Sequence, residues 1–462
     1  MATFRLVRDI PIEDGYDLVV AGGGPAGSAA AICAARLGAR VLLVEATGCL
    51  GGMGTSGLVT AFDPMANGER MLVGGFMREL VELMYERGFL QPGIDPDVWR
   101  KHCHRWTPFK VEGLKLLLDE LAVDAGVEVR FFTRAIDAEA DPGAGGVEGV
   151  VVQNVEGYRY VRAKTFVDAT GDAVLAHLCG VPCRDAGRDT PHIMPATLPS
   201  LFTGIDWDRF DKKGKQATLE RAIADGHFSQ PDRHLPGMSR VGYHVGYLNG
   251  GHIFDLDAVR CRSLSDGMML GRKIAAEYTE FYRKYMPGCE QIEHVTTAAL
   301  MGVRESRRIV GEYELSLDDY LARRQFPDQI GLFNKFVDIH PYDCSDAEWE
   351  RFRNQAFDEM RLGEGECFGM PYGIIVPKGW HNLWVAGRCA SSDVPVQGSI
   401  RVMPSSAMMG QAAGTAAVQS IETGQPAGEL DTAQLVERLR QDGAYLPQET
   451  LSQAMTRSSD QP

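Results

Sequence analysis

The sequence predicts an α/β fold built on a parallel sheet, and three neighbouring segments carry this prediction. Residues 17–21 form a short apolar run of strand type, and residues 26–37, which are mostly small and apolar, are typical of a helix. Residues 41–44 then form a second apolar run that is short enough for a buried strand. A strand, a helix and a strand in this order form a unit whose two strands run parallel.

The turn between the first strand and the helix carries a G-x-G-x-x-G pattern, and Glu45 follows eighteen positions after its last glycine. In this context each glycine has a physical reason. Gly22 permits the tight turn, Gly24 lets the backbone approach a pyrophosphate, and Gly27 lets the helix pack closely on the strand. The helix N-terminus offers unpaired N–H groups to phosphates, and Glu45 can accept from ribose hydroxyls. We therefore predict a bound dinucleotide rather than an empty glycine-rich turn.

Composition and residue patterns exclude several kinds of partner and cofactor. The 462 residues are 44% hydrophobic and carry a net charge of -15, so a large core is expected and a nucleic-acid partner is not. No secretory or membrane-spanning apolar segment is visible, which predicts a cytoplasmic protein without a membrane partner. The ten cysteines include no C-x-x-C pair, so free thiols are expected, without a redox dithiol or iron-sulfur ligation. His102-Cys103-His104 has no second ligand cluster beside it, and no metal site is predicted.

The chain after Glu45 alternates between loops and regular elements. Residues 46–57 contain five glycines and suit backbone lying against a flat ligand, although a flexible surface loop is the alternative. Helices are expected over 72–87 and 114–125, and a strand over 127–132. Residues 149–153 and 158–161 predict an antiparallel excursion that closes with the strand and turn at 163–172. Asp172 could cap a helix over 173–178.

The second half contains a change of composition and a return to the sheet. From about 183 to 343 the pattern is irregular, with a long helix over 265–285 that turns Met268, Met269, Ile274, Ala275, Tyr278, Phe281 and Tyr282 towards an apolar neighbour. A buried strand ends near Gly387, and Pro404 begins a helix of very small residues over 405–421. Such a helix packs tightly on a sheet or a ligand. We predict a cofactor domain at 1–182 with its excursion at about 130–162, a substrate domain at 183–343, the rest of the cofactor domain at 344–424, and a polar tail at 425–462.

These motifs resemble the glutathione-reductase-like class of FAD proteins. The narrower resemblance, over roughly residues 15–421, is to the bacterial FAD-dependent oxidoreductase family, which is related to fumarate reductase flavoproteins and thiazole-synthase-like proteins. It is carried by the segments at 50–55, 302–309, 338–340, 385–388, 398–404 and 410–416. The resemblance implies a Rossmann FAD-binding domain with an inserted α+β substrate domain. It also implies FAD, held noncovalently because residues 49–57 contain no histidine.

Carried over onto this sequence, the resemblance implies a set of FAD-binding residues. Val129 would meet the adenine through its backbone, Gly171 and Asp172 would lie on the diphosphate side, and Arg401 would address the flavin half. The full set is Gly22, Gly24, Pro25, Ala26, Gly27, Glu45, Ala46, Gly51, Gly52, Met53, Val129, Ala169, Gly171, Asp172, Gly387, Arg388, Ser399, Arg401, Ser406 and Gln411.

The catalytic candidates lie in two of these segments. Arg304, Arg307 and Arg308 could hold a substrate carboxylate, and His340 could be the proton-transfer group. The alternatives are a structural ion pair between Arg307 and Glu305 and a buried, hydrogen-bonded His340. His252, His244 and Tyr372 remain further candidates for proton transfer.

The leading hypothesis is an FAD-dependent oxidoreductase that transfers hydride between a small polar metabolite and flavin N5. Only one dinucleotide motif is present, which favours an unidentified electron donor or acceptor over direct use of NAD(P)H. A flavin-dependent monooxygenase or halogenase is the second hypothesis. A non-redox thiazole-synthase-like protein or an electron-transfer flavoprotein subunit is the third. The oligomeric state is left open, and a homo-oligomer is compatible with the sequence.

Overall fold

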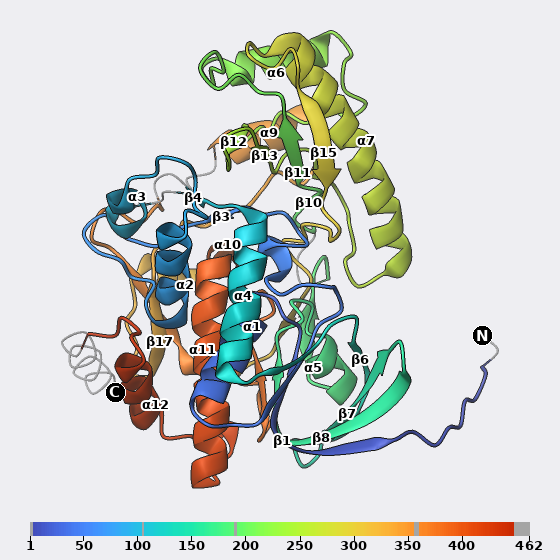
Figure 1. The fold of residues 1–462 in the computed structure, drawn as a ribbon, viewed down its shortest axis with the longest axis vertical. Helices are drawn as coiled ribbons and strands as arrows, with labels where there is room; N and C mark the ends of the chain where they lie inside the picture. The colour runs from blue at the N-terminus through green and yellow to red at the C-terminus, as the bar shows by residue number, and fades with distance from the viewer. Residues whose placement is uncertain (1–2, 104–105, 189–191, 355–359, 448–462) are drawn as a thin grey trace.

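The computed structural model describes residues 3–103, 106–188, 192–354 and 360–447. Figure 1 shows an α/β body with a smaller part above it that contains α6, α7, β11 and β15. The helices are α1 Pro25–Arg36, α2 Gly75–Glu86, α3 Pro96–Lys101, α4 Val111–Ala125, α5 Val174–Cys179, α6 Lys215–Ala224, α7 Cys261–Tyr285, α8 Leu317–Leu321, α9 Asp346–Asn354, α10 Val394–Ile400, α11 Met403–Thr423 and α12 Thr432–Gln441, with short 3-10 turns η1 Gly52–Gly54, η2 Tyr372–Ile375 and η3 Ala427–Glu429. The strands are β1 Ile12–Ala21, β2 Val41–Val44, β3 Ala61–Phe62, β4 Thr107–Pro108, β5 Glu128–Arg130, β6 Arg134–Asp141, β7 Gly146–Asn154, β8 Gly157–Asp168, β9 Cys183–Asp185, β10 Ala196–Thr197, β11 Ser200–Thr203, β12 Ser239–Arg240, β13 Gly246–Leu248, β14 His252–Ile253, β15 Glu293–Thr297, β16 Arg307–Ile309, β17 Gln329–Phe333, β18 Phe368–Pro371 and β19 Leu383–Val385.

The main sheet confirms the predicted mixed α/β class. Its strand order is β5-β2-β1-β8-β7-β6, and β19 pairs with β8. The pairs β5–β2, β2–β1, β1–β8 and β8–β19 are parallel, whereas β8–β7 and β7–β6 are antiparallel. The antiparallel excursion therefore has three strands, and β6 is one that the sequence analysis missed.

Strand β8 belongs to two parts of the sheet at once. Its first half pairs with β7 through Arg162↔Gly149 and its neighbours, and its second half pairs with β19 through Phe166↔Leu383. The sequence analysis divided this segment at residue 162, but the structure has one continuous strand. Because β8 also follows β1 along its length, it returns the chain to the glycine turn.

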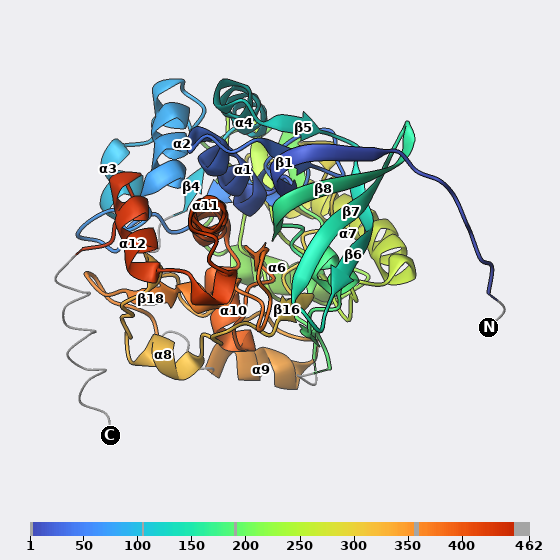
Figure 2. The ribbon, with the colours of Figure 1, turned by 90° about the horizontal axis from the view of Figure 1, so that it is seen from below.

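Helix α11 is packed against α1 more closely than ordinary side chains permit. A Cβ at Gly410 would lie 2.0 Å from the carbonyl oxygen of Ala26, and one at Gly414 would lie 2.2 Å from that of Ala30. The small residues predicted for this helix therefore serve backbone contact with α1. Figure 2 shows α11 almost end-on, beside α1.

The upper part in Figure 1 has its own core. Strands β12, β13, β11 and β15 form an antiparallel sheet, and α7 buries Ile274, Tyr278, Phe281 and Tyr282 in a second hydrophobic cluster. Met269, predicted to face the same neighbour, is exposed instead. None of the helices within the described ranges is long and apolar enough to cross a membrane.

Part of the predicted polar tail is regular structure. Helix α12 begins after Asp431, whose side chain accepts from the N–H groups of Ala433 and Gln434. Its residues Leu435, Val436 and Leu439 are buried in the main core, which also contains α11.

Candidate functional site

The carboxyl ends of the parallel strands surround a cavity of about 590 Å³. In open parallel sheets this edge is where ligands bind, because the turns that follow the strands meet there. Fifteen of the residues assigned to FAD from the sequence line this cavity: Gly22, Gly24, Pro25, Ala26, Glu45, Ala46, Gly52, Met53, Ala169, Gly171, Asp172, Gly387, Arg388, Arg401 and Ser406.

The glycine turn has the geometry of an open cradle. Gly22 has φ +96° and would place a Cβ 2.6 Å from the carbonyl oxygen of Ala169, while a Cβ on Gly27 would lie 1.7 Å from the oxygen of Gly22. In contrast, no protein atom lies within 4 Å of a Cβ placed on Gly24. The first and third glycines thus close the turn, and the second leaves space in front of the α1 N-terminus. A pyrophosphate fits this arrangement.

Glu45 is buried at the end of β2, where it also braces the glycine turn. Its Oε2 accepts from the N–H of Gly23 at 2.6 Å, and its Oε1 accepts from that of Thr47 at 2.7 Å. A carboxylate has about four acceptor sites, so both oxygens retain capacity for ribose hydroxyls.

Five of the assigned residues do not line the cavity. Gly27 acts through helix packing, and Val129 pairs within the sheet with Leu43. Gly51 adopts φ +96°, and a Cβ added there would lie 2.7 Å from the side chain of Thr55. Ser399 donates to the carbonyl of Lys335, and Gln411 accepts from the N–H of Phe76.

The cavity wall expected from Val129 comes instead from residues that the sequence analysis missed. Thr133, Arg134, Ala135 and Ile136 line it, a few positions further along the chain. The predicted strand continued to residue 132, but β5 ends at Arg130. Three of these residues begin β6, the strand that the sequence analysis missed, so this part of the cavity wall was not recognised.

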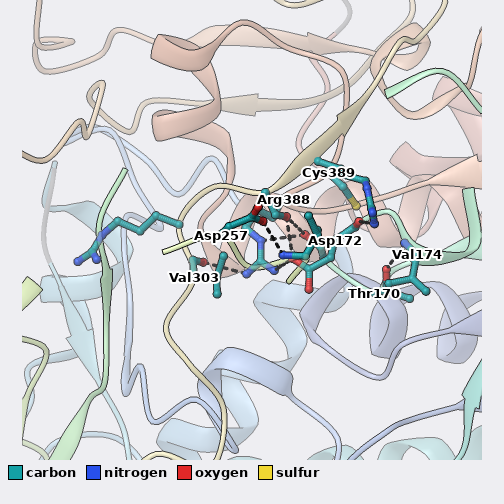
Figure 3. Close-up of polar contacts among 12 residues, drawn as sticks. Thr170, Asp172, Val174, Asp257, Val303, Arg388 and Cys389 are labelled. Carbon is teal, nitrogen blue, oxygen red and sulfur yellow. Dashed lines mark hydrogen bonds and ion pairs between the residues drawn. The ribbon is translucent and has the colours of Figure 1, made fainter. Parts of the chain in front are cut away.

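Arg388 joins three segments at the cavity, as Figure 3 shows. Its Nε donates to the carbonyl of Gly171 at 2.8 Å, one terminal nitrogen donates to the carbonyl of Val303 at 2.9 Å, and the other lies 2.5 Å from Asp172 Oδ1. Asp172 therefore pairs with Arg388 and does not cap α5 as suggested. That helix is held by Thr170, whose hydroxyl accepts from the N–H of Val174.

A second cavity of about 280 Å³ adjoins the first, and Met53, Val303, Arg388, Arg401 and Met403 line both. Titratable side chains gather in it, since Arg304, Asp338, His340 and His234 line it as well. The two cavities together place these side chains next to the strand ends.

A buried guanidinium group, that of Arg304, and a half-buried one, that of Arg401, lie in this second cavity. Arg304 donates to the carbonyl of Pro195 at 2.7 Å, and burial and Arg401 together lower its pKa to about 10. Arg401 donates to Asp338 through its carbonyl at 2.9 Å and its carboxylate at 3.2 Å. Within the described part of the chain, Arg304 has no carboxylate partner and the buried Nε of Arg401 has no acceptor. Of these two positive charges, only that of Arg401 is paired with a carboxylate among the described residues.

A cluster of three histidines borders the arginines. His252 Nε2 lies 2.9 Å from His340 Nδ1, and His340 Nε2 lies 3.5 Å from Asp338 Oδ1. Burial and Arg304 hold the pKa of His340 well below its usual range, and burial and His252 lower the pKa of His234 to about 3. Neutral imidazoles are therefore expected for His234 and His340 at neutral pH.

This cluster also satisfies a simple distance test for a metal ion, since one atom of each ring lies within 4.8 Å of the others. However, the rings of His234 and His252 are stacked, with centroids 4.8 Å apart and planes 24° apart. Lone pairs in nearly parallel planes do not converge on a point about 2 Å from both nitrogens, as a zinc ion requires. The cluster suits hydrogen bonding better than metal ligation. Of the earlier His102-Cys103-His104 segment, His104 lies outside the described residues.

The other catalytic candidates lie elsewhere. Arg307, on β16, lies 3.6 Å from Asp185 of β9 and lines neither cavity. The ion pair recorded for Glu305 is with Arg308, at 3.7 Å, and not with Arg307. His244 is exposed at a separate groove, and the Tyr372 hydroxyl donates to the carbonyl of Ala427 at 3.0 Å. His234 was missed, because no local pattern marks a histidine whose partners are distant in the sequence.

The sheet, the open glycine cradle and the acid after β2 together define a dinucleotide-binding α/β protein. The sequence model of the FAD dependent oxidoreductase family matches residues 17–439. The chain therefore belongs to the FAD dependent oxidoreductase family, and the predictions of an FAD-dependent enzyme and of FAD as its cofactor are confirmed.

Individual relatives are distant. Digeranylgeranylglycerophospholipid reductase 2 of Methanopyrus kandleri is 30% identical over 164 residues, 34% of this chain and 37% of that protein. Dihydrolipoyl dehydrogenase of Trypanosoma brucei brucei is 56% identical over 45 residues, 10% of this chain and 9% of its own length. The chain thus spans well under half of the curated relatives that it matches.

Two solved structures match most of the chain at low identity. A geranylgeranyl bacteriochlorophyll reductase-like protein from Thermoplasma acidophilum has a TM-score of 0.47 and 16% identity, covering 97% of this chain and 92% of that one. The p-nitrophenol 4-monooxygenase PnpA from Pseudomonas putida has a TM-score of 0.48 and 12% identity, covering 97% and 90%. Similarity at this level does not indicate a substrate.

Proposed function

We propose that this protein is an oxidoreductase that exchanges hydride between FAD and a small metabolite bearing a carboxylate. The observation that carries the proposal is the pair of guanidinium groups in a cavity that adjoins the cofactor cleft, the buried Arg304 and the half-buried Arg401. Buried charges are normally paired, and Arg304 lacks a carboxylate partner within the described residues. A substrate carboxylate would supply that partner.

The placement of FAD follows from the residues of the cleft. Gly22, Gly24 and Glu45 would hold the ADP half, and Gly387, Arg401 and the N-terminus of α11 would hold the flavin half. The same placement supports a glutathione-reductase-like Rossmann domain with an inserted α+β substrate domain. FAD would be held noncovalently.

The chemistry divides between the cofactor and the chain. When bound, FAD supplies a site that takes up or releases a hydride. Arg304 and Arg401 bind the carboxylate and orient the substrate, and their positive charge favours electron-rich species at the junction of the two cavities. His340 accepts a proton from the substrate on oxidation, or returns one on reduction.

The test uses the purified holoenzyme without oxygen. Carboxylic acids, including hydroxy acids, amino acids and saturated dicarboxylates, are mixed with it, and loss of the oxidised flavin band is followed. Bleaching by an acid but not by its amide or methyl ester supports the proposal. Bleaching by the uncharged analogue at the same rate contradicts it.

Variants assign the roles. Arg304→Met should raise KM and lower kcat/KM roughly tenfold to a hundredfold, the value of one hydrogen bond to a charged group. His340→Ala should retain flavin but slow bleaching about a hundredfold or more. Arg307→Met is the matched control, because Arg307 lines neither cavity, and it should behave as the wild type.

The alternatives predict different results. Oxidation of NAD(P)H with substrate-dependent oxygen uptake would favour a flavin-dependent monooxygenase or halogenase. A flavin that no metabolite reduces, in a protein that co-purifies with another subunit, would favour an electron-transfer role. Turnover without any change in the flavin would favour non-redox, thiazole-synthase-like chemistry.

A further inference from the structure

A buried lysine lines the second cavity and has no part in the function described so far. Lys335 is 2% exposed, and it lines this cavity together with Asp63, which is also buried. Lys335 follows β17 and Asp63 follows β3, so two segments that are far apart in the chain bring the pair together. Lysine side chains are rarely buried, because the ammonium group is strongly hydrated, so this one calls for a physical reason.

The ammonium group of Lys335 is held in place and still has donors to spare. Its Nζ donates to Asp63 Oδ2 at 2.5 Å and lies 3.6 Å from the centroid of the Phe336 ring, whose face attracts a cation. Ser399 Oγ donates to the backbone carbonyl of Lys335 at 2.7 Å. An ammonium group has three N–H donors, and within the described ranges Asp63 is the only acceptor that they meet. An acceptor atom of a bound ligand can therefore complete the set.

Lys335 lies among the groups that were assigned above to the substrate. Arg304, Arg401 and His340 line the same cavity. Asp338 lies between several of them, because its carboxylate accepts from Arg401 at 3.2 Å and approaches His340 Nε2 at 3.5 Å. Burial would raise the pKa of this carboxyl group, but His340, Lys335 and Arg401 hold it well below its usual range. A substrate between Arg304 and His340 would therefore share the cavity with the ammonium group of Lys335.

The charges on the cavity wall discriminate between kinds of carboxylic acid. The cationic side chains that line it are Arg304, Lys335, Arg388 and Arg401, and the carboxylates that line it are Asp63 and Asp338. Cations therefore outnumber carboxylates on the wall. This excess opposes the ammonium group of an amino acid and favours an electron-rich oxygen in its place. A hydroxy acid thus fits the cavity better than the amino acid with the same carbon skeleton.

We propose that Lys335 is a further catalytic residue that binds the oxygen on the reacting carbon, and that the substrates are hydroxy acids and the corresponding oxo acids. The proposal rests on the function proposed above, and Asp63 is the positioning residue that holds the ammonium group. On oxidation the C–H bond breaks and its electron pair leaves with the hydrogen as hydride to the cofactor, the O–H proton passes to His340, and a C=O bond forms. Lys335 keeps its proton and stabilises the negative charge that develops on the oxygen. Reduction of the oxo acid follows the same steps in reverse.

The main test substitution is Lys335→Gln, which keeps a donor group but removes the positive charge. The kcat for flavin bleaching by a hydroxy acid should fall about 10²- to 10³-fold, the usual effect of removing one donor to a developing oxyanion. KM should rise by tenfold at most, because Arg304 still binds the carboxylate, and flavin content should not change. Lys335→Arg should recover part of the rate. Lys378→Gln, an exposed change outside both cavities, is the control.

Calorimetric titration of the oxidised holoenzyme measures the same contact without turnover. The ligands are an oxo acid, which is already oxidised, and the unsubstituted acid of the same skeleton, which lacks the hydroxyl. The wild type should bind the oxo acid roughly tenfold or more tightly, the value of one hydrogen bond from a charged group. Lys335→Gln should bind both acids equally, and Asp63→Asn should lose part of the difference while the affinity for the unsubstituted acid stays within a few fold. If Lys335→Gln does not fold because the Asp63 carboxylate has lost its cation, the double variant Asp63→Asn/Lys335→Gln replaces it.

The outcomes separate this proposal from the function on which it rests. Bleaching by a hydroxy acid that falls in Lys335→Gln, together with loss of the preference for the oxo acid, would support both. Bleaching by an amino acid or a saturated acid but not by the matching hydroxy acid would overturn the role of Lys335 and leave a carboxylate-dependent oxidoreductase. Equal affinities for the two ligands in the wild type, or an unchanged kcat in Lys335→Gln, would overturn it in the same way. If no carboxylic acid binds or reduces the flavin, both proposals fail.

Discussion

Gly24 offers the sharpest test of the cofactor cleft, because the protein itself leaves this position open. Its φ of −66° and ψ of −173° are accessible to any residue, and no protein atom lies within 4 Å of an added Cβ. Gly24→Val should therefore fold normally, with a free energy of unfolding of the flavin-free protein within about 1 kcal/mol of wild type.

The same substitution should greatly weaken FAD binding. The new side chain would stand in the cavity in front of the first N–H groups of α1, where the pyrophosphate is expected. Hydrogen bonds to a charged group contribute roughly 1.5–3 kcal/mol each, so the loss of two would cost roughly 3–6 kcal/mol. The dissociation constant of FAD should rise by roughly 10²- to 10⁴-fold.

Flavin titration of the stripped protein, with urea unfolding of the same samples, separates the two effects. Gly146→Val is the matched control, since Gly146 lies on β7, outside the cavity, and also has no atom within 4 Å of an added Cβ. It should bind FAD as the wild type does. Wild-type affinity in Gly24→Val would refute the placement of the pyrophosphate, and a large loss of stability would refute the open position.

The remaining predictions concern stability and pH. Gly410→Val would press on the Ala26 carbonyl, so it should lower the free energy of unfolding by about 1–3 kcal/mol or more and reduce flavin content; an unchanged denaturation midpoint would contradict the α1–α11 contact. The pKa of His234 is about 3 in the fold and about 6.5 in the unfolded chain, so between these pH values the unfolded chain binds the extra proton. The free energy of unfolding should therefore decrease as the pH is lowered from about 6.5 towards 3, by up to about 1.4 kcal/mol per pH unit. Urea unfolding at several pH values should show a smaller slope for His234→Gln, and equal slopes would count against the buried neutral ring. For activity, the depressed pKa of His340 predicts that flavin bleaching persists below pH 6.5. Because Arg304 helps to lower that pKa, Arg304→Met should shift the acid limb of the pH–rate profile to higher pH.

The sequence by itself determined the β1-α1-β2 unit, the positions of the three glycines in its turn and the acid that follows. These features are local, because strand and helix periodicity and the conformational freedom of glycine are set by neighbouring residues. The helix of small residues could also be located, although its contact with the backbone of α1 could not. The excursion was less accurate, and because β6 was missed, its residues Arg134 to Ile136 were not recognised in the cavity wall.

Only the tertiary structure decided which distant side chains meet. Arg388 and Asp172 are 216 residues apart in the sequence and in direct contact, whereas Arg307, which shares a segment with Arg304, lies outside both cavities. The contacts that link Asp232, His252 and His340 likewise join three separate segments. Side-chain chemistry limits what each residue can do, but the partners that fix its charge and its protons are supplied by the packing of segments far apart in the chain.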